Sequence, residues 1–180
     1  MFTDDGGLGR FVNALARWTA VAGGLALIGM TVLICVSVLG RALLWAGLKP
    51  ITGDYELVSI GMGFAVFAFM PWAHLKRGHA LVALVTDALS PASNRILLVI
   101  TDLAMLVAAA FIAWRLYAGM LDKFAYKETT LLLRFPLGWA YAFGLVGAVI
   151  LVIVSAFVLG RSVGMALRGE NEPKGAGGDA

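Results

Sequence analysis

Long runs of apolar residues dominate the chain, and four of them are long enough to cross a lipid bilayer. They extend over about residues 18–40, 55–75, 96–116 and 137–160. A spanning helix needs about 20 such residues. Because a backbone in lipid must satisfy its own hydrogen bonds, each run is expected to be helical. The pattern therefore predicts an all-α integral membrane protein with four transmembrane helices.

The segments outside these runs differ in character. Residues 80–90 are moderately amphipathic and too short to span, which predicts a short interfacial amphipathic helix. Residues 117–135 carry mixed charges, and we expect a surface loop that could meet another protein. The tail, residues 169–180, is polar and rich in glycine, so we expect it to be disordered. One membrane domain thus covers residues 1–168.

Composition and charge agree with a membrane protein. The 180 residues are 61% hydrophobic and only 14% charged, with a net charge of +3. A soluble domain has about 25% charged residues. The basic residues flank the apolar runs, so they indicate membrane boundaries and not a nucleic-acid partner. The single cysteine, Cys35, lies inside the first run and is interpreted as a small core residue.

The distribution of lysine and arginine predicts the orientation in the membrane. Four spans place both termini on one side. That side carries eight basic residues: Arg10, Arg17, Lys76, Arg77, Arg95, Arg161, Arg168 and Lys174. The opposite side carries six: Arg41, Lys49, Arg115, Lys123, Lys127 and Arg134. The positive-inside rule therefore predicts cytoplasmic termini.

The stretch WAHLKRGHALV contains both histidines of the chain and its densest positive charge. His74 and His79 are five residues apart, so on one helix they point about 140° away from each other. This geometry suits neither a haem held between helices nor a metal site. We interpret Lys76 and Arg77 as the inward end of the second span. His79 is expected to serve positioning or assembly.

Asp102 is the one acidic residue inside the third span. Ionisable residues deep in a membrane are costly and often mark proton or ion pathways. Asp102 lies about 9 Å from the start of its span at 1.5 Å per residue, away from the midplane. We interpret it as a polar residue with a partner, Arg95 being seven residues earlier. A proton or ion role and a contact with another subunit are the alternatives.

Charged residues also meet at the ends of the first two spans. Arg41 closes the first span, and Asp54 and Glu56 open the second on the same side of the membrane. Because such charges are costly alone, we expect Arg41 to pair with Glu56 or to share a contact with a partner subunit. The alternative is that both side chains extend to water.

Four pieces of the sequence follow one another in a characteristic order. They are SVLGRALLW with Arg41, DYELVSIGMGF with Glu56, RGHALVALVTDALSP with Gly78, His79 and Asp87, and TTLLLRFPLGWAYAFGLVGAVIL with Pro136, Trp139 and Tyr141. Together they resemble the small membrane subunit (Q type, DctQ-like) of tripartite ATP-independent periplasmic (TRAP) transporters, and the resemblance covers residues 10–161. The family often has an Asp two or three residues after the Gly-His pair, where this chain has none.

The resemblance implies a multi-pass protein of the bacterial inner membrane that is not an enzyme and holds no cofactor. Its partner would be a large M subunit of the elevator type, which binds sodium and the substrate. A periplasmic binding protein would deliver an organic acid to the pair. The small subunit would enlarge the static scaffold of the M subunit and hold it in the membrane lipids.

Two other classes of protein are weighed against this one. A membrane anchor of a respiratory or other enzyme complex is disfavoured because histidines placed to bind haem are missing. A self-sufficient small transporter is disfavoured because the first and fourth spans carry no charge.

Overall fold

The computed structural model describes residues 6–76 and 91–168, with side chains described for residues 96–166 of the second part. Its four long helices are each long and apolar enough to cross a membrane. This confirms the predicted all-α fold with four spans. The helices are α1 (Gly7–Ala42), α2 (Asp54–Leu75), α4 (Pro91–Ala125) and α5 (Leu137–Arg168), and one 3-10 turn, η1 (Leu44–Ala46), follows α1.

Three expectations fall on residues that are not described: the interfacial helix at 80–90, the polar tail at 169–180, and the positions of Arg77 and His79. The described helices contain the predicted spans, but three of them continue further. α1 has 36 residues, which corresponds to about 54 Å against a hydrocarbon core of about 30 Å. The reason is that hydropathy detects only the part of a helix in lipid, whereas its backbone bonds persist in water.

The segment between the third and fourth spans is where the structure differs most clearly from the prediction. α4 continues to Ala125, so the first half of the expected loop at 117–135 is helical. The connection to α5 is confined to the residues between Tyr126 and Pro136. The prediction of a surface loop holds only for this shorter part.

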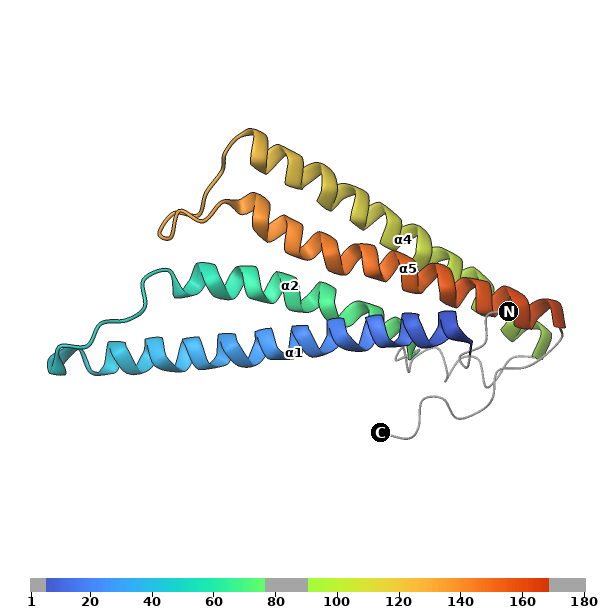
Figure 1. The fold of residues 1–180 in the computed structure, drawn as a ribbon, viewed down its shortest axis with the longest axis horizontal. Helices are drawn as coiled ribbons and strands as arrows, with labels where there is room; N and C mark the ends of the chain where they lie inside the picture. The colour runs from blue at the N-terminus through green and yellow to red at the C-terminus, as the bar shows by residue number, and fades with distance from the viewer. Residues whose placement is uncertain (1–5, 77–90, 169–180) are drawn as a thin grey trace.

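The helices form two hairpins, α1 with α2 and α4 with α5 (Figure 1). α5 packs against both α4 and α2, and α2 packs against α1, so the order across the molecule is α1, α2, α5, α4. The hairpins approach each other at the end away from their loops and draw apart toward the loops (Figure 1). Half of the most apolar window of α5 is buried, against 11% in α1 and in α4. α5 is therefore the central helix, and α1 and α4 are the outer ones.

The main core lies where the two hairpins meet. Residues of α1, α2 and α5 form it, so it joins the first hairpin to the second. Its members are Val12, Ala16, Leu75, Ile150, Val154, Phe157 and Val158.

Nearer the middle of the helices, α2 and α5 approach closely because α5 carries a glycine. A Cβ atom at Gly147 would lie 2.8 Å from the main-chain oxygen of Phe67. One turn earlier on α5, Gly144 faces the Phe67 ring. Phe64 and Phe143 meet edge to face, with ring centroids 6.5 Å apart. Small residues are the usual means by which membrane helices come this close.

Candidate functional site

The loop end of the first hairpin holds a polar contact between α1 and α2. The Ser37 hydroxyl, buried in α1, donates a hydrogen bond of 2.5 Å to Oδ2 of Asp54 at the start of α2. The other carboxylate oxygen of Asp54 accepts a bond of 2.8 Å from the Tyr55 main-chain N–H. The Arg41 guanidinium is 3.7 Å from Asp54, and most of its side chain is exposed. The close contact is therefore Ser37 with Asp54, and Arg41 adds a looser ion pair.

The expected pair of Arg41 with Glu56 was wrong, since Arg41 meets Asp54. Residues two apart on a helix point about 160° away from each other. Asp54 therefore faces α1, whereas Glu56 faces the second hairpin. There its carboxylate accepts hydrogen bonds from the main-chain N–H groups of Leu132, at 2.8 Å, and Leu133, at 2.9 Å.

The connection that Glu56 binds is itself ordered by hydrogen bonds. The N–H of Thr130 donates to the carbonyl of Phe135 at 2.9 Å, and the Phe135 N–H donates to the Thr130 hydroxyl at 3.1 Å. An isolated β-bridge joins Thr129 to Pro136. We call residues 127–136, the connection between α4 and α5, the outer loop. Glu56 thus ties the outer loop of the second hairpin to α2 of the first.

Replacing Glu56 with Gln should loosen the outer loop. The amide oxygen can still accept a bond, but the NH2 group would oppose the second main-chain N–H. We expect the amide hydrogens of Leu132 and Leu133 to exchange several-fold faster in hydrogen–deuterium exchange. Asp54→Asn is the matched control, because Asp54 faces α1, and it should leave exchange in the outer loop unchanged. Equal exchange in Glu56→Gln and the parent protein would contradict this role of Glu56.

At the opposite end of the helices, α4 is joined to α5 by a buried polar contact. Asp102 is 5% exposed and Ser162 3% exposed, and the Ser162 hydroxyl donates a short hydrogen bond to Oδ2 of Asp102. The side chain of Arg95, the partner expected from spacing, is not among those described. Asp102 therefore faces the inside of the protein and contacts the central helix.

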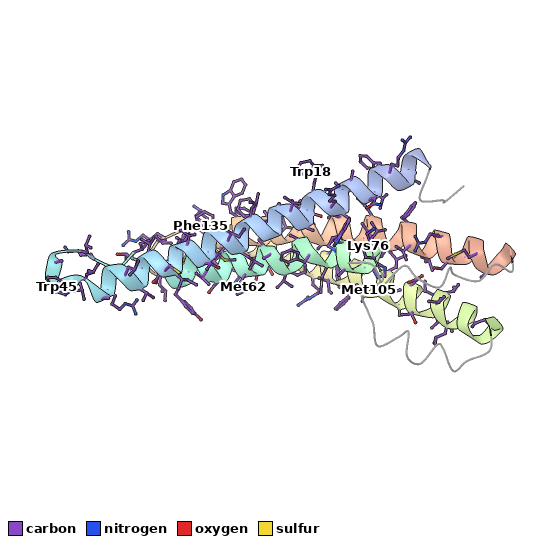
Figure 2. All side chains as sticks on the ribbon, turned by 90° about the horizontal axis from the view of Figure 1, so that it is seen from below. Trp18, Trp45, Met62, Lys76, Met105 and Phe135 are labelled. Atoms are coloured by element: carbon purple, nitrogen blue, oxygen red, sulfur yellow. The ribbon has the colours of Figure 1, made fainter. Side chains whose placement is uncertain are left out.

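The inward end of α2 is partly buried. The His74 side chain is 4% exposed, so it lies inside the packed helices. Lys76 follows the helix, and its ammonium lies 5.0 Å from the centre of the Trp72 ring. Figure 2 places Lys76 far from the loop end, where Trp45 lies. Within residues 6–76 and 91–168, no group of three or more His, Cys, Asp or Glu side chains could hold a metal ion.

Two residues in these contacts, Ser37 and Ser162, were not predicted. A serine in an apolar run is a weak signal, because its hydroxyl can bond to the carbonyl one turn earlier in the same helix. Thr31 does so, donating to the carbonyl of Leu27 at 2.9 Å. One cue was available: Ser37 precedes Arg41 by four residues, so the two share a helix face.

The fold and these contacts define a multi-pass, all-helical membrane protein in which polar side chains join helices near their ends. More closely, the chain belongs to the DctQ component family of tripartite ATP-independent periplasmic transporters, whose model matches residues 30–164. The matched part runs from within α1 through most of α5. Comparisons with curated proteins and with solved structures gave no match. The protein is therefore a membrane component of a TRAP transporter, as the resemblance predicted.

Proposed function

We propose that this chain is the non-catalytic small subunit of a sodium-driven, binding-protein-dependent TRAP transporter for an organic acid. In this role it serves as a scaffold for a large elevator-type M subunit. The observation that carries the proposal is the family match over residues 30–164. The polar contacts support it, because Asp54, Glu56 and Asp102 each bind another part of this chain. Such contacts stiffen a scaffold.

The outer helices offer the surface that a scaffold needs. Only 11% of the most apolar window is buried in α1 and in α4. Large apolar side chains on these helices are exposed, among them Leu25 and Ile28 of α1 and Val107 and Phe111 of α4. In a membrane such faces meet lipid or another membrane protein. We propose that part of this surface binds the M subunit.

The remaining parts of the proposal follow the family and the charge pattern. Sodium and substrate bind the M subunit, and this chain holds no cofactor. A periplasmic binding protein delivers the substrate. The protein lies in the bacterial inner membrane with cytoplasmic termini, as the excess of lysine and arginine on that side favours. Membership of a transporter family favours this function over a membrane anchor for a respiratory enzyme.

Co-expression with the M subunit tests the scaffold role. We expect an affinity-tagged copy of this chain to retain the M subunit through detergent extraction and size-exclusion chromatography. Proteoliposomes with both subunits and the binding protein should take up substrate when sodium is present outside. Two results would contradict the proposal: failure of the two chains to co-purify, or sodium-driven uptake by this chain alone.

A further inference from the structure

The outer loop presents two leucines that the described part of the chain leaves largely exposed. Leu131 is 93% exposed and Leu132 62% exposed, and we call these two residues the leucine tip. The next residue, Leu133, packs instead over Gly53, where an added Cβ would lie 2.5 Å from its Cγ. Glu56 binds the main-chain N–H groups of Leu132 and Leu133. The leucine tip is thus held in place from two sides while its side chains point away from the protein.

The backbone on both sides of the leucine tip adopts an uncommon conformation. Lys127 has φ 51° and Arg134 has φ 52°, in the left-handed region that L-residues other than Gly, Asn and Asp seldom occupy. Such positions cost free energy and persist only where surrounding contacts hold them. The hydrogen bonds of the outer loop supply those contacts. The backbone shape of the loop is therefore held by these contacts, and the two basic residues flank the leucine tip along the chain.

Two acidic residues in or near the outer loop bind groups other than Lys127 and Arg134. Glu56 binds the loop backbone, and Glu128 forms an ion pair with Lys123 at 2.6 Å. Lys127 and Arg134 are exposed and have no ion pair among the described residues. The outer loop thus combines two exposed leucines with exposed basic residues on both sides of them in the sequence.

The position of the loop decides what can meet this surface. Leu137, directly after the outer loop, begins a helix that is apolar from its start and long enough to cross a membrane, so the loop lies close to a membrane boundary. It lies beside the start of α2 (Figure 1), where Glu56 binds it. Tyr126 and Trp139 next to it are exposed, as aromatic residues in an interfacial belt are. Leucine, aromatic and basic side chains together are the composition of a segment that inserts at the headgroup level.

We propose that the outer loop is a phospholipid-binding anchor. The leucine tip enters the boundary between headgroups and acyl chains, and Lys127 and Arg134 bind the phosphates of anionic lipids. The chemistry is that of any peripheral anchor, in which apolar insertion and attraction to anionic headgroups act together. This lipid contact is separate from the scaffold role, so either could fail without the other.

A fluorescent probe at the leucine tip tests the insertion. Cys35 is the single cysteine of the chain. It is exposed on α1, so its interpretation as a core residue was wrong. Cys35→Ala with Leu131→Cys allows a nitrobenzoxadiazole label at one site. The full chain is reconstituted in nanodiscs of phosphatidylcholine and phosphatidylglycerol, alone and with the M subunit if the two co-purify. We expect lipids with a doxyl group at carbon 5 to quench the fluorescence of the label more than lipids with the group at carbon 12. Aqueous iodide should quench it less than it quenches the free dye. A label at Ile28, which is exposed within α1, serves as the reference for a position deep in the bilayer. The free dye serves as the reference for a position in water.

The outcomes separate the possible neighbours of the leucine tip. Iodide quenching equal to that of the free dye would place the tip in water and overturn the proposal. Protection from both iodide and doxyl lipids would show that protein covers it, which also overturns the proposal. Loss of co-purification with the M subunit would concern the scaffold role alone.

The two cations are tested on the same labelled protein. Lys127→Asn with Arg134→Asn removes both charges but keeps residues that tolerate a left-handed φ. We expect the inserted fraction of the label to lose its dependence on phosphatidylglycerol. The equilibrium constant for insertion should fall about fivefold for each cation removed. Lys127→Arg with Arg134→Lys retains both charges and should retain the dependence. An unchanged dependence in the Asn variant would overturn the phosphate contact.

Discussion

Replacing Gly147 with alanine is expected to separate α2 from α5 and to destabilise the protein. The new Cβ would lie 2.8 Å from the oxygen, and 2.9 Å from the carbon, of the Phe67 carbonyl. These are main-chain atoms, which cannot move aside by a rotamer change. Overpacking of this kind costs about 1–3 kcal/mol. It outweighs the helix propensity that alanine gains over glycine, about 1 kcal/mol. Gly147→Leu should have a larger effect.

Gly164→Ala is the matched control on the same helix, because nothing lies within 4 Å of its added Cβ. Thermal melting of both variants in detergent, followed by size-exclusion chromatography, provides the comparison. The control should melt at or slightly above the parent temperature, and Gly147→Ala clearly below it. If both variants melted like the parent, the close approach of α2 to α5 at Phe67 would be refuted.

Replacing Asp102 with alanine should loosen α4 from α5. The change removes the carboxylate that accepts the hydrogen bond of the buried Ser162 hydroxyl. Removing one partner of a buried hydrogen bond costs about 1–3 kcal/mol. Asp102→Asn keeps an oxygen acceptor for the serine and should lose less stability. Reversible unfolding in mixed micelles with increasing sodium dodecyl sulfate measures the difference.

A double-mutant cycle with Ser162→Ala isolates the contact itself. Coupling between hydrogen-bonded side chains in membrane helices averages about 0.6 kcal/mol and reaches about 1.7 kcal/mol. We expect a value in this range for Asp102 and Ser162, because both side chains are buried. Strict additivity of the two single variants would show that the hydrogen bond contributes nothing to the packing of α4 on α5.

The charged residues show how far sequence reasoning reaches. Arg41, Glu56 and Asp102 stood out because charges in or beside lipid need a partner. In the structure, Arg41 and Glu56 have different partners from the ones expected, and the expected partner of Asp102 is not described. The direction in which a side chain points depends on its position around the helix. The partner that a side chain meets in that direction is known only once the neighbouring helix has been positioned.

The outer loop gives a second example. Its mixed charges indicated a surface segment, but its hydrogen bonds to Glu56 join residues 76 and 77 positions apart in the sequence. A local pattern in the sequence cannot predict a contact between residues so far apart in the chain. The same holds for the left-handed backbone of Arg134, because arginine gives no indication of it.

The sequence by itself determined that four helices span the membrane and which of their ends carry charge. Both properties follow from the cost of transferring each residue into lipid, which is a local quantity summed along the chain. Only the tertiary structure decided the order α1, α2, α5, α4, the contact of Gly147 with Phe67, and the pairing of Ser37 with Asp54 and of Ser162 with Asp102. In lipid, apolar faces of all four helices are nearly equivalent. The choice among neighbours therefore rests on shape and on a few hydrogen bonds between residues far apart in the chain.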